Sequence, residues 1–227
     1  MLRWIFDSGV DGVDIRTIGH HNCVNSYVKY AFAEPVRSAF RERYGREVEA
    51  APEDYERIRR LRGESYTQFM REAKALAVRY GKRLHAHIEW GAHIPPHLDT
   101  RLQMQMVVEW EKWIREGIVD EVSLRGWASQ NSCVHRRILP LARRMKVPVH
   151  VISRCLASGN DFRAMEVCER FVPEACAAGL SGFRLYESSD LLRMNAEGIP
   201  MPVGLIHEAV RKARCALDRF GSHVSAK

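Results

Sequence analysis

Short runs of strand-forming residues alternate with longer helical patterns along this 227-residue chain. Such an alternation is typical of βαβ units, in which helices connect the strands of a parallel sheet. Strands are predicted at five places, namely Val10–Thr17, Arg83–Trp90, Asp120–Trp127, Val147–Cys155 and Gly179–Glu187. Helices are predicted over Glu53–Tyr80, Thr100–Glu116, Val134–Met145, Asp161–Ala178 and Leu205–Phe220, and residues 1–9 are interpreted as the end of an earlier helix.

Each predicted strand has one apolar face and one polar face. In the second strand, for example, Leu84 and Ala86 alternate with His85 and His87, and successive side chains of a strand point to opposite faces. An open doubly wound sheet is covered by helices on both faces and needs both to be apolar. A barrel has an interior that can become polar towards the carboxyl ends of its strands. We therefore predict an α/β protein with a parallel (β/α) TIM-type barrel.

Five strand–helix units are three fewer than a TIM barrel contains. We expect residues 1–227 to form a single, partial barrel domain made of the last five of eight units, with a frayed tail at 221–227. The three earlier units are expected to be missing or to be supplied by another chain. Open sheet edges favour pairing with other strands, so self-association through the edges of the barrel is also expected.

Composition narrows the classes of partner. The net charge is +7, but the basic residues are interleaved with Glu and no aromatic-plus-basic motif is present, so no nucleic-acid partner is expected. The sequence contains no apolar run of about 18 residues, so no membrane span is predicted. Its first residues do not resemble a secretory signal. The six Cys residues include no CxxC pair, which argues against a disulfide framework. These features predict a cytoplasmic protein if the amino terminus is complete.

Three segments carry a resemblance to a known family. Gly9–Arg16 reads GVDGVDIR, Glu34–Gly45 reads EPVRSAFRERYG and Arg60–Arg71 reads RLRGESYTQFMR. With these motifs the chain resembles, from about Gly9 to Gly204, the bacterial barrel proteins described as family-10-like glycosyl hydrolases. The resemblance implies that Val10–Thr17 is the fourth of eight barrel strands, with an acidic residue at its carboxyl end. It also implies that the second segment is a loop, that the third is a helix, and that the activity is hydrolysis of glycosidic bonds without a cofactor.

The chain departs from the related retaining glycosidases at one strand. Those enzymes place a Glu at the end of strand four and another at the end of strand seven. Here strand four offers Asp14, and strand seven ends in Ser153, Arg154 and Cys155 without a carboxylate. A catalytic site on this chain therefore needs a different pair of carboxyl groups.

Asp14 is the first candidate for a catalytic carboxylate, because it lies on the polar face near a strand end. Glycoside hydrolysis uses two carboxyl groups, one as the acid and one ionised. Glu89 is the second candidate, since neighbouring strands lie about 5 Å apart and its strand follows that of Asp14 in the sequence. Glu187 on the last strand is a third. The alternative is that Asp14 pairs with Arg16 or Arg184 and only neutralises charge in the interior.

Two other functions remain open at this point. His85, His87 and Glu89 alternate on one strand face, and imidazole and carboxylate groups are ligands that divalent metals accept. A metal-dependent hydrolase or isomerase would use these three residues, with His150 and Asp190 completing the ligand set. A non-catalytic sugar-binding protein or an inactive partial barrel is the third possibility.

The remaining polar and aromatic residues near the strand ends are expected to bind substrate. Several arginines on the polar faces must pair with carboxylates or meet an anion, which favours a polar substrate such as an acidic sugar. Aromatic rings at the mouth of a barrel stack on the apolar faces of sugars. The predicted substrate-binding residues are Arg16, His20, His21, Asn25, His85, His87, Arg125, Trp127, Arg154, Arg184 and Tyr186.

Overall fold

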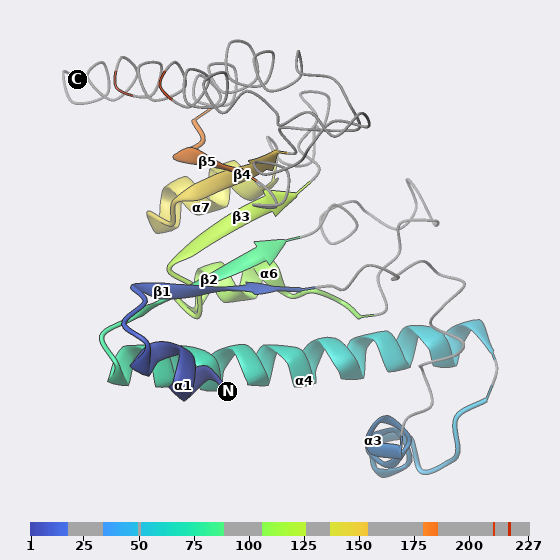
Figure 1. Cartoon of the computed structure of the whole chain (residues 1–227). Helices are drawn as coiled ribbons and strands as arrows, with labels where there is room; N and C mark the ends of the chain where they lie inside the picture. The colour runs from blue at the N-terminus through green and yellow to red at the C-terminus, as the bar shows by residue number, and fades with distance from the viewer. Residues whose placement is uncertain are drawn as a thin grey trace, which may run out of the picture. The chain divides into compact units, whose positions relative to one another are not determined.

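The computed structural model confirms an α/β chain whose paired strands are parallel. It describes residues 1–17, 34–49, 51–88, 106–125, 137–153 and 179–185, together with Arg211 and Asp218. All five predicted strands are present with shorter bounds, and Figure 1 labels them along the chain. They are β1 (Gly12–Arg16), β2 (Arg83–Ile88), β3 (Glu121–Arg125), β4 (Val149–Ser153) and β5 (Gly182–Leu185).

The chain divides into two compact units. The first contains Met1–Val122 and Leu141–Val147, and the second contains Ser123–Pro140 and Pro148–Lys227. The hydrogen-bonded strand order is β1-β2-β3 where the sheet lies in the first unit and β3-β4-β5 where it lies in the second. The order of the strands in each unit is therefore the order of the strands in the sequence.

β1 and β2 form a parallel pair in the first unit. Their register places Gly12 beside Arg83 and Ile15 beside Ala86. At Gly12 the two backbones approach closely, because a Cβ atom built there would lie 2.6 Å from the carbonyl oxygen of Arg83. The absence of a side chain at Gly12 thus allows β1 to reach its register on β2.

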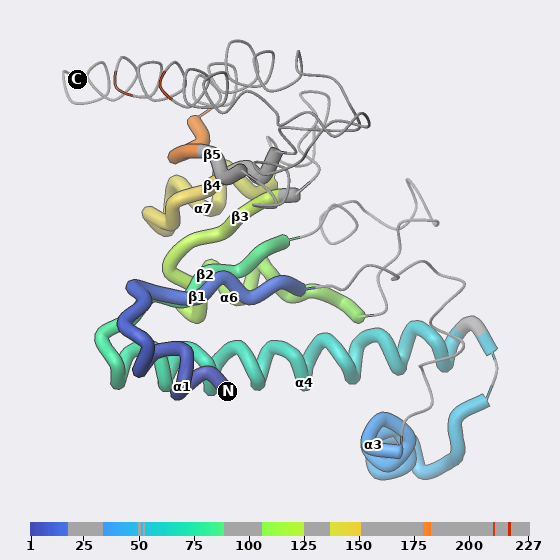
Figure 2. The backbone as a smooth tube through the Cα atoms, in the orientation of Figure 1, coloured from blue at the N-terminus to red at the C-terminus, as the bar shows by residue number. Residues whose placement is uncertain are grey.

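The apolar face of β2 packs into the core of the first unit. Leu84, Ala86 and Ile88 are fully buried, and α4 (Pro52–Arg79) contacts β2. The short helix α1 (Leu2–Asp7) runs beside α4, as both ribbon and tube show (Figures 1 and 2). The prediction of a helix over Glu53–Tyr80 is confirmed to within one residue at each end.

The segment expected from the resemblance to be a loop is a helix, α3 (Glu34–Tyr44). Pro35 stands in its first turn, where the missing N–H removes no helical hydrogen bond. Gly45 follows the last residue with a φ of +68°, a conformation that glycine adopts at low cost and that ends a helix. α3 packs on α4 through a core cluster formed by Phe40, Ile58 and Leu61.

The prediction of a helix over Thr100–Glu116 is confirmed at its carboxyl end and wrong before Trp110, in the part that the structure describes. The helix there, α6, covers only Trp110–Arg115, and Val107–Glu109 are not helical. The N–H of Val107 donates instead to the carbonyl oxygen of Arg59 on α4 at 3.0 Å. At this contact Gly63 faces the Val107 backbone, and a Cβ atom at Gly63 would lie 2.1 Å from the Val107 oxygen. Docking against α4 therefore accompanies the absence of helix at 107–109.

The second unit pairs β4 with β5 in parallel. His150 lies beside Gly182 in the register, and a Cβ atom at Gly182 would lie 3.0 Å from His150 Nδ1. The helix α7 (Leu139–Met145) lies within the predicted range Val134–Met145. The helices predicted over Asp161–Ala178 and Leu205–Phe220 and the tail at 221–227 lie outside the described residues, apart from Arg211 and Asp218, which are helical. No helix in the described part of the chain is long and apolar enough to cross a membrane.

Candidate active site

The polar face of β1 and β2 gathers four of the residues that the sequence singled out. The register places Asp14 beside His85 and Arg16 beside His87. Since side chains two residues apart on a strand share a face, these four side chains belong to one face of the strand pair. The backbone register thus places Asp14, His85 and His87 on one face of the strand pair.

Access differs among these side chains. Asp14 is exposed, whereas the side chain of His85 is 13% exposed and His87 is buried. Arg16 is half-buried. An exposed carboxylate beside a largely buried imidazole can accept hydrogen bonds from a ligand and exchange protons with it.

Tyr66 and Thr17 hold the carboxyl ends of the two strands. The hydroxyl of Tyr66 on α4 donates to the carbonyl oxygen of Arg16 at 3.1 Å. The hydroxyl of Thr17 donates to the carbonyl oxygen of His87 at 2.8 Å. Burial raises the pKa of Tyr66 to about 12, so its phenol remains a protonated donor at neutral pH. These contacts position the backbone at the end of the row formed by Arg16 and His87.

Glu121 and Arg83 extend the polar face, and the sequence reasoning did not select either. Glu121 opens β3, with its carboxylate 3.5 Å from His85 Nε2 and 2.7 Å from Arg83 Nη1. The signal was available, because Glu121 has the same parity as Ser123 and Arg125, whose alternation defines the polar face of that strand. Glu121 lies within the predicted strand Asp120–Trp127, but it was not assigned to the polar face.

The predicted metal set is only partly described. His85 and His87 lie on β2 and His150 lies on β4, while Glu89 and Asp190 lie outside the described part of the chain. Within the described ranges, no three His, Cys, Asp or Glu side chains lie together as a metal site.

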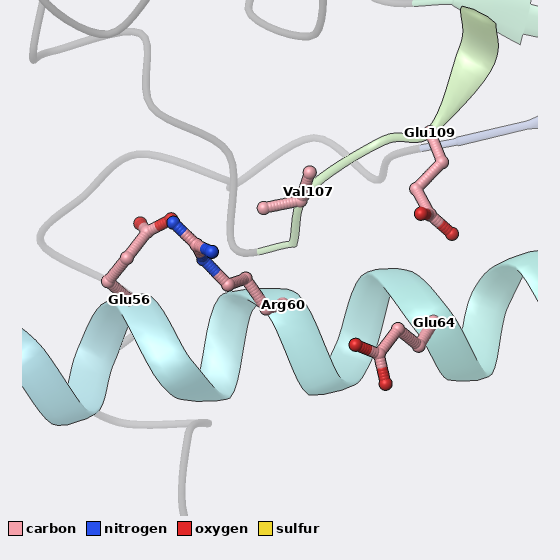
Figure 3. A pocket seen from close by; sticks show the side chains of 5 residues that line it. All are labelled: Glu56, Arg60, Glu64, Val107 and Glu109. Atoms are coloured by element: carbon pink, nitrogen blue, oxygen red, sulfur yellow. The ribbon is translucent and has the colours of Figure 1, made fainter. Parts of the chain in front are cut away.

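A cavity of about 290 Å³ lies elsewhere in the first unit, lined by Glu56, Arg60, Glu64, Val107 and Glu109 (Figure 3). Its size is at the small end of ligand pockets, which range from about 300 to 1,000 Å³. Each of its carboxylates has a basic partner: Arg60 binds Glu56, Arg43 binds Glu64 and Lys112 lies 3.6 Å from Glu109. The cavity therefore has no charge excess that would select a ligand.

The side chains of the other predicted site residues are not among those that the structure describes. Only the backbones of Arg125 and Arg184 are described, on β3 and β5. The remaining predicted residues lie outside the described residues, namely His20, His21, Asn25, Glu89, Trp127, Arg154, Tyr186 and Glu187.

The chain is similar in structure to known proteins, although its sequence matches no family model. No protein-family model matches the sequence, and no curated protein matches it. Among solved structures, the chain is similar to the catalytic domain of a β-amylase from Paenibacillus polymyxa, with 14% sequence identity and a TM-score of 0.39. The match covers 79% of this chain and 55% of that chain, so this chain spans just over half of the length of the amylase domain.

Proposed function

We propose that the strands of this chain belong to a (β/α) barrel and that the polar face of β1 and β2 is a glycoside hydrolase site. Asp14 is the first catalytic carboxylate in this proposal, and the reaction uses general acid–base chemistry. The observation that carries it is the register of β1 on β2, which places the exposed Asp14 beside the largely buried His85.

The strand order supports the barrel. In a doubly wound sheet the order of the strands reverses at a switch point, whereas in a barrel each strand pairs with the next one in the sequence. The order β1-β2-β3 in the first unit and β3-β4-β5 in the second contains no reversal. The polar alternation on β2 agrees with a lumen-facing surface, because its apolar residues Leu84, Ala86 and Ile88 are fully buried in the core.

Glu89 is the second carboxylate of the proposal. It follows Ile88, the last residue of β2, and its sequence parity matches that of His85 and His87. The carboxyl ends of barrel strands are where catalytic residues lie, and two carboxyl groups are what glycoside hydrolysis requires.

The polar neighbours of Asp14 favour a substrate rich in hydroxyl groups. His85 and His87 offer ring nitrogens, and Arg16 offers a planar guanidinium that can donate several hydrogen bonds. A carbohydrate, or another small polar substrate, presents hydroxyl groups that can hydrogen-bond to such side chains. Catalysis at this face would therefore combine sugar-hydroxyl binding by β2 with carboxylate chemistry from Asp14.

A hydrolysis and binding screen on the full chain tests the proposal. The chain is assayed against neutral and acidic glycans as the natural sequence and as Asp14→Asn and Glu89→Gln. Each substitution is expected to lower kcat by about 100-fold or more, which is the usual contribution of general acid–base catalysis. Asp11→Asn is the matched control, because Asp11 is an exposed aspartate three residues before Asp14, and it should retain full activity.

Two results would refute the proposal. Full activity in both Asp14→Asn and Glu89→Gln would show that the catalytic site lies elsewhere. Glycan binding without turnover by the natural chain would instead support a sugar-binding protein.

A further inference from the structure

Glu121 contacts two residues on the polar face of β2. Arg83 Nη1 donates to Glu121 Oε1 at 2.7 Å, whereas His85 Nε2 lies 3.5 Å from Glu121 Oε2, close enough for electrostatic attraction but without a hydrogen bond. The side chains of Glu121 and His85 are 10% and 13% exposed, whereas that of Arg83 is 60% exposed. The two carboxylate oxygens therefore have different neighbours, a solvated guanidinium and a largely buried imidazole.

Because Glu121 is buried, its carboxylate depends on Arg83 and His85 for favourable interactions. A carboxylate removed from water needs nearby positive charge or hydrogen-bond donors. Arg83 meets one of its oxygens and fixes the orientation of the group, which directs the other oxygen towards His85. A carboxylate at this position favours a proton on the nearer imidazole nitrogen, because the partner of a histidine ring determines which nitrogen is protonated.

Acidic residues lie on the strands on both sides of His85. Arg83 and His85 lie on β2, Glu121 lies on β3, and Asp14 on β1 is the register partner of His85. His87, the next polar residue of β2, is paired in register with Arg16 instead. His85 is thus the group of this face that has a carboxylate residue on the strand to each side.

We infer that Glu121 is a positioning residue for His85, and that it orients the imidazole beside Asp14 with the proton on Nε2. Arg83 holds Glu121 in place for this role. The consequence for catalysis rests on the proposed function: His85 presents a fixed ring to substrate next to the catalytic carboxylate. A nitrogen that carries this proton cannot ligate a metal, so the same arrangement disfavours Nε2 of His85 as a metal ligand.

Nitrogen NMR of the imidazole side chains tests the positioning role without any substrate. The full chain is compared with Glu121→Gln, which keeps an acceptor but no charge, and with Glu121→Met, which keeps neither at similar size. The His85 signals are assigned with His85→Gln. The ratio of Nε2-protonated to Nδ1-protonated ring is expected to fall from Glu to Gln to Met, by about fivefold or more over the series, because the negative charge near Nε2 is removed first and the polar group after it. Glu109→Gln, which alters a partly buried carboxylate outside this face, should leave the His85 signals unchanged.

The same ratio in all three proteins would overturn the inference. If Glu121→Met does not fold, Arg83→Met provides the test, since it leaves Glu121 in place but releases its orientation and should shift the ratio in the same direction. Kinetics on any glycan hydrolysed by the natural chain supply the second measurement. Glu121→Met should lower kcat with little change in KM, and unchanged kcat despite an altered ratio would refute the catalytic consequence. Because the NMR result needs no turnover, failure of the positioning role and failure of the hydrolase proposal are separate outcomes.

Discussion

The buried carboxylate of Asp54 provides the sharpest stability prediction. Asp54 is 1% exposed, in the first turn of α4, and accepts two hydrogen bonds from Arg46 at 2.8 Å, one from Arg57 at 2.8 Å and one from the backbone N–H of Glu49 at 2.9 Å. The hydrogen bonds from Arg46 are the largest cause that lowers its pKa from 3.8 to about 2. These bonds connect the chain after α3 to the start of α4.

The magnitude follows from the pKa. The pKa of Asp54 is nearly two units lower in the folded state than in the unfolded state, which corresponds to about 2.5 kcal/mol of stabilisation at about 1.4 kcal/mol per unit. Both guanidiniums are 41% exposed, so solvent screens part of the attraction. We expect Asp54→Asn to lower the free energy of unfolding by about 1–2 kcal/mol at pH 7, because the arginines left behind can be solvated.

The pH dependence has a definite sign. A carboxyl group whose pKa is lower in the folded state stabilises the fold above its unfolded pKa, and this contribution is lost as the pH falls through the folded value. The difference in stability between the natural chain and Asp54→Asn should therefore be full above about pH 4 and diminish towards pH 2.

Urea unfolding followed by far-UV circular dichroism measures this difference, since α4 is the longest described helix. Glu53→Gln is the control, because Glu53 is an exposed carboxylate in the same helical turn, and it should change stability by less than about 0.5 kcal/mol. An effect of Asp54→Asn that equals the control, or that persists undiminished at pH 2, would refute the reasoning.

Two further substitutions test the packing of α4. Gly63→Ala should lower Tm, because the new Cβ would lie 2.1 Å from the Val107 oxygen. Alanine by itself favours a helix by about 1 kcal/mol over glycine, so a rise in Tm would show that the contact is absent. Thr67→Val should lower the free energy of unfolding in urea by about 1–3 kcal/mol, because it removes the hydroxyl that accepts a hydrogen bond from the buried Trp113 indole N–H at 2.8 Å. Ser65→Ala, at an exposed position two residues earlier, is the control. Equal effects of the two substitutions would contradict this role of Thr67.

The prediction of strands from sequence was accurate because the alternation of side chains is a local property. Leu84 and Ala86 had to lie on one face and His85 on the other in any strand covering these residues, and the structure buries the two apolar side chains completely. Helical periodicity is equally local: Trp110 and Trp113, three residues apart on α6, share a face, and both are buried. The left-handed glycines at Gly9 and Gly117 were likewise predictable, since each follows a helix end.

One error occurred where a distant contact outweighs the local pattern. The helical pattern before Trp110 is interrupted because Val107 donates to Arg59, 48 residues earlier in the sequence. The other error concerns the helix at Glu34–Tyr44, which the family resemblance implied to be a loop. Its local signals, Pro35 in the first turn and Gly45 after the last residue, favoured a helix, and only its packing on α4 depends on distant residues.

The sequence by itself determined which strands exist and which of their faces is polar, because both depend on residues one or two positions apart. Only the tertiary structure decided that Asp14 stands beside His85 and that Glu121 lies against it, since these pairs are separated by 71 and 36 positions. Sheet register fixes such neighbours, and register depends on where two backbones can approach, as they do at Gly12 and Arg83.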